Sequence, residues 1–245
     1  MHIHRGRIGM SAVQGLISLL EAIAARQVAR RPSAVAPADI ALVSGYDDRI
    51  ASYAKGIADN NIAYARRHGY ASYVHTGGFS RRRHPSWSKI LFVLQALRRH
   101  RWALWCDADA LVMDHAKRIE DLLDPRFDLI FARWGGPNPP PHVNCGVFLV
   151  QNTVFARAFL HAAWWHRSLI HHFWWEQGAI NHMLDSHRFD RVKQVAQYRD
   201  FNAFVGVRDD PDPYRPGDFI AHLSGFRDTE GRIQASRDFL KNVSP

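Results

Sequence analysis

Hydrophobic and polar positions along the chain fall into segments of two kinds. Short apolar runs predict buried strands at residues 39–44, 70–74, 102–106, 128–133, 143–150, 192–195 and 218–222. Apolar residues at helical spacing predict helices over 49–68, 86–100, 153–165, 175–184 and 232–241, with a shorter one near 118–123. Ser86 and Thr153 are the expected starts of two of these helices. Because strands and helices alternate, we expect an α/β fold with a mainly parallel central sheet flanked by helices.

The first 38 residues follow a different pattern. Apolar residues recur at helical spacing from Val13 to Ile23, but polar residues such as Glu21 interrupt every run long enough to span a bilayer. We therefore expect neither a transmembrane anchor nor a signal peptide. The segment 1–38 predicts an amphipathic helix and a linker, and the helix either packs on the domain or makes peripheral contact with a membrane surface. The globular domain is expected to span residues 39–245.

Composition narrows the class of protein only slightly. A chain of 245 residues, 47% hydrophobic and 22% charged, has room for one sizeable domain and resembles ordinary soluble proteins. Its net charge of +9 draws anions such as nucleotides, nucleic acid or an acidic membrane. Cys106 and Cys145 lie in apolar runs without disulfide or zinc spacing, so we expect a reducing, cytoplasmic location, with or without contact to a membrane surface.

Two carboxylates follow the central apolar strand. Asp107 and Asp109 come directly after residues 102–106, two positions apart, where strand geometry turns alternate side chains to the same side. Such a pair needs a positive charge in front of it, and a hard divalent cation with oxygen ligands fits best. Asp-x-Asp is a weak signal by itself. It also occurs in phosphatases in which the first Asp attacks phosphate, so Asp107 as a nucleophile stays an alternative.

Further short motifs surround the acid pair in a fixed order. They are Asn61-x-x-Tyr64-Ala-x-Arg67-His68-Gly69-Tyr70, Trp87-x-Lys89, Trp105-x-Asp107-Ala-Asp109-Ala110, Asn144-x-Gly146-Val-Phe148, Glu176-Gln177-Gly178-x-x-Asn181 and His222-x-x-Gly225. Together they resemble the GT-A-type glycosyltransferases, in particular the fungal α-galactosyl- and α-mannosyltransferases and plant xyloglucan xylosyltransferases of one family. The last three motifs are also similar to those of glycogenin-like transferases. The resemblance spans about residues 39–225 and implies a single GT-A domain with a Rossmann-like nucleotide-binding half.

The resemblance also implies roles for individual residues. Asp107, Asp109 and His222 would hold Mn²⁺ or Mg²⁺, and the imidazole ligand favours manganese. Asp107 would also lie near the donor ribose. The other implied donor-binding residues are Ser44, Tyr46, Lys89, Asn144, Gly146, Gly225 and Arg227. Glycogenin-like proteins carry a Lys three residues after the Gly of His-x-x-Gly, where this chain has Asp228.

The implied reaction is sugar transfer with retention of anomeric configuration. A UDP- or GDP-linked sugar would be the donor, and a glycan or another hydroxyl group the acceptor. Glu176 and Gln177 are the expected catalytic residues, either through a covalent intermediate on Glu176 or through front-face attack with Gln177 supporting the reacting face. A binding module for nucleic acid or an anionic membrane is a further alternative. Its nucleic-acid form is not expected, because the arginines are scattered rather than gathered on one face.

Overall fold

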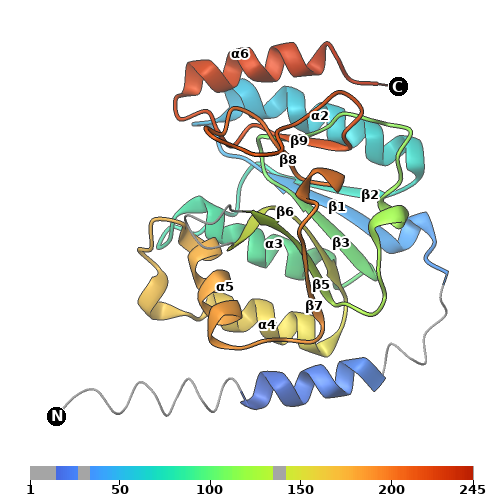
Figure 1. Cartoon of the computed structure of the whole chain (residues 1–245), viewed down its shortest axis with the longest axis vertical. Coiled ribbons are helices and arrows are strands. Elements are labelled where there is room, and N and C mark those ends of the chain that lie inside the picture. The colour runs from blue at the N-terminus through green and yellow to red at the C-terminus, as the bar shows by residue number, and fades with distance from the viewer. Residues whose placement is uncertain (1–14, 27–33, 135–141, 245) are drawn as a thin grey trace.

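The computed structural model describes residues 15–26, 34–134 and 142–244, and it has the predicted α/β architecture (Figure 1). The strands are β1 (Ile40–Gly45), β2 (Ala71–His75), β3 (Trp102–Cys106), β4 (Ala110–Val112), β5 (Leu129–Trp134), β6 (His142–Gln151), β7 (Val192–Val195), β8 (Ala203–Phe204) and β9 (Ile220–His222). The helices are α2 (Ala51–His68), α3 (Ser88–Ala96), α4 (Val154–Trp164), α5 (Trp175–Ser186) and α6 (Thr229–Leu240). The predicted 135–141 loop lies outside the described residues.

A six-stranded sheet in the order β2-β1-β3-β6-β5-β7 forms the centre of the fold. The prediction of a mainly parallel sheet is confirmed, with one exception: β6 runs antiparallel to both of its neighbours, β3 and β5. A second sheet, β4-β9-β8, was not predicted from the sequence. β4 has three residues and β8 has two, which is too short to show an alternating pattern.

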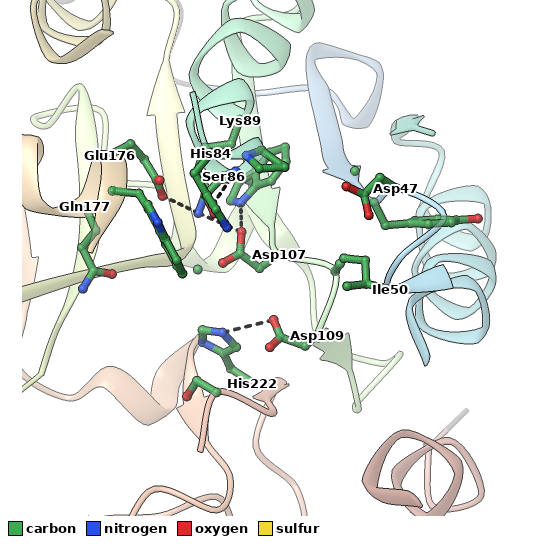
Figure 2. A pocket seen from close by; sticks show the side chains of 18 of the residues that line it. Asp47, Ile50, His84, Ser86, Lys89, Asp107, Asp109, Glu176, Gln177 and His222 are labelled. Carbon is green, nitrogen blue, oxygen red and sulfur yellow. Dashed lines mark hydrogen bonds and ion pairs between the residues drawn. The ribbon is translucent and has the colours of Figure 1, made fainter. Parts of the chain in front are cut away.

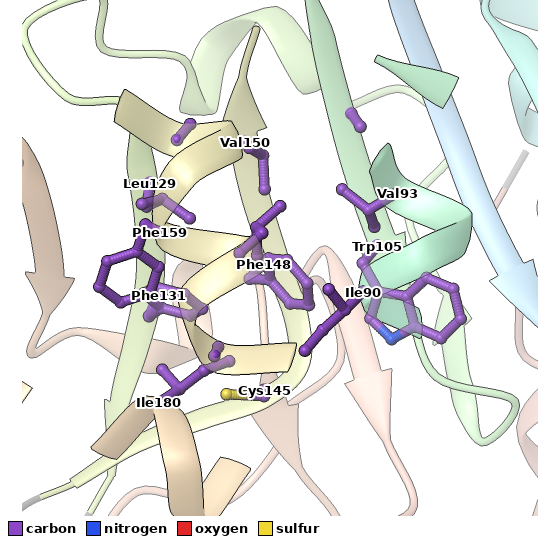
Figure 3. Packing of buried hydrophobic residues seen from close by; sticks show 14 of the residues in the cluster. Ile90, Val93, Trp105, Leu129, Phe131, Cys145, Phe148, Val150, Phe159 and Ile180 are labelled. Carbon is purple, nitrogen blue, oxygen red and sulfur yellow. The ribbon is translucent and has the colours of Figure 1, made fainter. Parts of the chain in front are cut away.

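Helices cover both faces of the central sheet. In Figure 1, α3, α4 and α5 lie on one face, while α2, α6 and the small sheet lie on the other. The core beneath α3 and α4 is rich in aromatic and branched side chains such as Trp105, Phe131, Phe148 and Ile90 (Figure 3). Each such side chain, once fully buried, contributes about 1.5–3 kcal/mol of hydrophobic free energy. This packing holds the strand ends, and therefore the polar residues that follow them, in fixed positions.

Two helix starts were predicted, and only one is confirmed. Thr153 is the N-cap of α4, since its side chain accepts a hydrogen bond from the backbone N–H of Ala156. The prediction for Ser86 is wrong, because residues Pro85–Trp87 form a 3₁₀ turn and α3 begins at Ser88. Ser86 instead donates its backbone N–H to Nδ1 of His84 at 3.4 Å. A proline in the first turn favours this tighter start.

The N-terminal region contributes a helix over residues 15–26. Ile17 and Ala24 are buried against the domain, and the Glu21 carboxylate accepts a hydrogen bond of 2.6 Å from the backbone N–H of Arg191. Leu16 and Leu19 point outward and are more than half exposed. One face of the helix thus packs on the domain, and membrane contact by the other stays a prediction. Among the described residues, no helix combines the length and hydrophobicity needed to cross a bilayer.

Candidate active site

A cavity of about 660 Å³ opens beyond the carboxyl ends of β1 and β3. This edge of an open α/β sheet is the usual place for ligands. The acid pair lies in the middle of the cavity, with Asp47 and Ile50 to one side and Glu176 and Gln177 to the other (Figure 2). The cavity therefore collects residues from the β1–α2 connection, from the end of β3 and from the start of α5.

Asp107 is fixed at the end of β3 by three contacts. Its backbone N–H donates to the carbonyl of Gly146 at 2.7 Å, and its Oδ1 accepts a hydrogen bond of 2.7 Å from Nε1 of Trp105. The ammonium of Lys89 lies 2.8 Å from the same Oδ1. The second carboxylate oxygen has none of these partners, which leaves it available toward the cavity, where Asp107 is about a third exposed.

Asp109 and His222 face each other across the boundary between the two sheets. Nε2 of His222 lies 3.4 Å from Oδ1 of Asp109, and Nδ1 lies 3.0 Å from Oδ1 of Asn202. The amide of Asn202 donates to Oδ1 of Asn144 at 3.0 Å, so its own oxygen must accept from Nδ1–H of the imidazole. This network places a proton on Nδ1 and turns Nε2 toward Asp109, and a ring protonated on Nδ1 alone would offer its Nε2 lone pair to a cation there.

The donor set fits a divalent cation. Ligand atoms of Asp107, Asp109 and His222 all lie within 4.8 Å of one another. An imidazole nitrogen and a carboxylate oxygen 3.4 Å apart are spaced so that one cation can bind both. Burial raises the pKa of the Asp109 carboxyl, but the contacts with His222 and with Arg232 outweigh burial, and the net pKa is lowered. Asp109 therefore carries its charge at neutral pH. Two carboxylates and one imidazole suit Mn²⁺ better than Mg²⁺.

Gly146 makes room for the imidazole. A Cβ at this position would lie 2.8 Å from Nε2 and 2.9 Å from Nδ1 of His222, and closer still to the carbon between them. The register of β6 against β5 also shifts here, because Phe131 pairs with Phe148 while the next residue, Ala132, pairs with Asn144. Such bulges re-aim side chains beside active sites. The sequence motif pointed to close contact with a ligand, and the structure shows close contact with His222 instead.

Lys89 lines the cavity, but it is almost fully buried beside the acids. Its ammonium is 2.8 Å from Asp107, 2.8 Å from Glu176 and 3.0 Å from the carbonyl of Cys145, and the side chain is 4% exposed. These three acceptors use all three N–H groups. Burial by itself disfavours the ammonium, but the two carboxylates outweigh burial and raise the pKa of Lys89. Burial also raises the pKa of the Glu176 carboxyl.

The two expected catalytic residues line the cavity at the start of α5. Oε1 of Glu176 is held by Lys89, while its buried Oε2 has no hydrogen-bond partner among the described residues. Oε1 of Gln177 accepts the backbone N–H of Cys145 at 3.0 Å. That bond directs the NH₂ group of Gln177 away from the strand. Both side chains therefore have polar atoms left for a ligand in the cavity.

Among the remaining predicted donor contacts, Tyr46 and Asn144 line the cavity, whereas Ser44, Gly225 and Arg227 are not among its described lining residues. Ser44 is buried in β1. A Cβ at Gly225 would overlap the backbone of Gly206 and Val207, so this glycine permits two loops to pack. Arg227 is exposed.

Arg232 is the basic residue that the sequence analysis missed. Asp228 caps α6 by accepting the backbone N–H of Gly231 at 2.7 Å. The first turn of the helix then carries Arg232 into the cavity, with its Nε 3.5 Å from Oδ2 of Asp109 and its guanidinium 5.8 Å from the centre of the Tyr53 ring. In the sequence, the capping residue Asp228, four positions before Arg232, could have indicated where this helix begins. Asn202 was missed as well, because no motif surrounds it.

Solved structures share this fold. A glycosyltransferase involved in the glycosylation of the major capsid of PBCV-1 superposes with a TM-score of 0.62 at 20% identity, covering 81% of this chain and 98% of that one. The galactosyltransferase LgtC, in complex with donor and acceptor sugar analogs, gives a TM-score of 0.52 at 15% identity. The match covers 84% of this chain and 96% of that one. The apo form of the glycosyltransferase GlyE from Streptococcus pneumoniae TIGR4 gives a TM-score of 0.53 at 14% identity and covers 83% of this chain and 62% of that one. The fold is that of the GT-A glycosyltransferases.

Sequence comparisons point to the same class. Residues 40–128 match the galactosyl transferase GMA12/MNN10 family. An uncharacterized alpha-1,2-galactosyltransferase of Schizosaccharomyces pombe is 30% identical over 82 residues, which are 31% of this chain and 24% of that protein. The match thus spans about a quarter of the relative's length. The chain thus has the fold of the GT-A glycosyltransferases, and residues 40–128 resemble one galactosyltransferase family, which favours that prediction over the phosphatase and the binding module.

Proposed function

We propose that the protein is a metal-dependent, retaining glycosyltransferase that moves a sugar from a UDP- or GDP-linked donor to a hydroxyl acceptor. One observation carries the proposal: Asp107 and Asp109 meet His222, which is more than a hundred residues further along the chain, with ligand atoms within 4.8 Å of one another. Nε2 of His222, turned toward Asp109, supports a cation between them. The GT-A fold and the family match of residues 40–128 support sugar transfer as the reaction.

Departure of the sugar leaves a nucleoside diphosphate on which negative charge grows. A metal bound by Asp107, Asp109 and His222 would act as a Lewis acid toward that diphosphate. The Arg232 guanidinium, on the cavity wall beside Asp109, adds a second positive charge that is part of the protein. In this proposal Arg232 takes the place of the lysine that glycogenin-like proteins carry at the position of Asp228.

The opposite side of the cavity would orient the transferred sugar. The buried, unpartnered Oε2 of Glu176 is an acceptor for a sugar hydroxyl, and the NH₂ group of Gln177 is a donor. Lys89 holds Glu176 and Asp107 at 2.8 Å each, so it fixes the spacing between sugar and metal. A buried ammonium with these partners stabilises the arrangement without touching the donor.

A thermal-shift screen tests this function directly. UDP- and GDP-sugars are added with and without Mn²⁺ to the wild-type protein, to Asp109→Ala and to Asp59→Ala, a surface control whose carboxylate pairs with Lys55 on α2. One diphosphate class should stabilise the wild type and the control only when metal is present, by about 2.7 kcal/mol at a hundredfold excess over Kd. Asp109→Ala should not respond. A wild-type protein indifferent to every nucleotide sugar would refute the proposal.

A further inference from the structure

Two tryptophans that line the cavity, Trp174 and Trp175, directly precede Glu176 and Gln177 in the chain. Trp175 stacks on His84 with ring centres 3.8 Å apart and an angle of 5° between the planes. Trp174 stacks on His142 at 4.5 Å and 27°. We call His84, Trp174 and Trp175 the aromatic wall.

The aromatic wall includes a residue with a strained backbone conformation. Trp175 has a φ of +49°, a backbone conformation that bulky residues rarely adopt, and its side chain is 40% exposed. Gly178 makes the turn possible, because a Cβ there would lie 2.6 Å from Cγ of the His172 ring, which folds back over the start of α5. A strained backbone that presents a large apolar ring to solvent does not serve stability, and such strain gathers at ligand sites.

Trp175 differs from its neighbour Glu176 in its exposure to solvent. Glu176 is buried beside Lys89 and the metal-binding acids, whereas Trp175 stands next to it in the chain and remains exposed. Asp47, which follows β1, lies on the side of the cavity across from Glu176 and Gln177 (Figure 2). A ligand lying on Trp175 would therefore reach the transferred sugar from the solvent side, as an acceptor must.

An indole ring suits one class of acceptor best. The C–H faces of a pyranose ring are apolar and pack on an aromatic plane, while its hydroxyl groups need polar partners at the ring edge. Ser86 and Arg49 line the cavity close to His84 and offer such partners. Resting on the proposed function, we propose that the acceptor is a saccharide and that one of its rings stacks on Trp175.

Replacement of Trp175 tests the inference. Trp175→Ala, Trp175→Phe and the control Trp165→Ala are compared; Trp165 is 60% exposed and lies outside the described residues that line the cavity. Each protein is assayed for transfer to a panel of oligosaccharides, and donor affinity is measured by calorimetry with Mn²⁺. Trp175→Ala should raise the acceptor KM about tenfold or more, Trp175→Phe should restore most of the loss, and donor Kd should stay within about twofold. Trp165→Ala should behave as wild type.

Other outcomes contradict the inference in distinguishable ways. A loss of donor affinity in Trp175→Ala equal to the loss in acceptor KM would mean that the wall binds the nucleotide. An unchanged acceptor KM would mean that no sugar ring touches Trp175. If the wild type binds no donor at all, the proposed function fails. The inference is then tested by quenching of tryptophan fluorescence with the same oligosaccharides. Quenching that is lost in Trp175→Ala supports a saccharide site, and absence of quenching in the wild type overturns it.

Discussion

The tightest contact in the site is between Gly146 and the His222 imidazole, and it makes Gly146→Ala an informative substitution. The added methyl group would overlap the ring carbon Cε1 and lie 2.8 Å from Nε2, against ~3.5 Å for ordinary contact, so the ring must retreat by well over about 0.7 Å. Metal–ligand distances tolerate only about 0.2 Å. Since Asn202 holds the other side of the ring at 3.0 Å, the imidazole cannot move freely without losing that hydrogen bond as well.

The expected loss follows from these distances. Displacing a ligand or its supporting partner typically lowers metal affinity about 10- to 100-fold, and forcing a methyl group into packed space costs about 1–3 kcal/mol of stability. Mn²⁺ affinity is measured by calorimetry, and unfolding by urea denaturation without metal. Gly77→Ala is the matched control, because a Cβ at Gly77 meets nothing within 4 Å. It should change neither quantity by more than about 0.5 kcal/mol.

One result would refute this reasoning. If Gly146→Ala binds Mn²⁺ as tightly as the wild type while Asp109→Ala does not, then His222 is not a ligand. The acids alone would hold the ion. A loss of stability without a loss of metal affinity would lead to the same conclusion, because the clash would then be real and the imidazole unimportant.

Two further predictions concern the support of the metal site and the surface. Asn202→Leu keeps the volume but cannot accept Nδ1–H of His222, so Mn²⁺ affinity, measured by calorimetry, should fall about 10- to 100-fold. Hydrogen bonds from Arg126 lower the pKa of Asp124 to about 2. The stabilisation from Asp124 should therefore be complete above the unfolded-state pKa of about 4 and fade as the pH falls toward 2. Because Arg126 is exposed, the loss should be less than about 1 kcal/mol. Urea denaturation of Asp124→Asn and wild type at about pH 6 and pH 2.5 checks this, and a gap between them that persists at the lower pH would contradict it.

The sequence predicted the elements whose pattern is local. β3 is a five-residue apolar run, and α2 ends at Gly69, whose φ of +76° suits glycine alone. The acid pair at the end of β3 was equally visible. The antiparallel direction of β6 was not, because a fully buried strand shows the same apolar run in either direction.

The missed site residues share a physical cause. Arg232 reaches Asp109 because Asp228 sets where α6 begins, and Asn202 meets His222 because β8 pairs with β9. Both contacts depend on tertiary packing between segments far apart in sequence. Lys89 was found from the sequence, but its partners were not, because only the fold shows that its ammonium lies between Asp107 and Glu176.

The charges in the cavity explain why these residues act as one unit. Asp107, Asp109 and Glu176 face two cationic groups, Lys89 and Arg232, while Asp47 is already paired with Arg49. These three carboxylates and two cations sum to an excess of one negative charge. A nucleoside diphosphate is repelled by that excess, and a divalent cation reverses its sign. Under the proposed function, the carboxylates that bind the cation would therefore also make donor binding depend on it, and metal affinity at Asp109 would be coupled to donor affinity at Arg232.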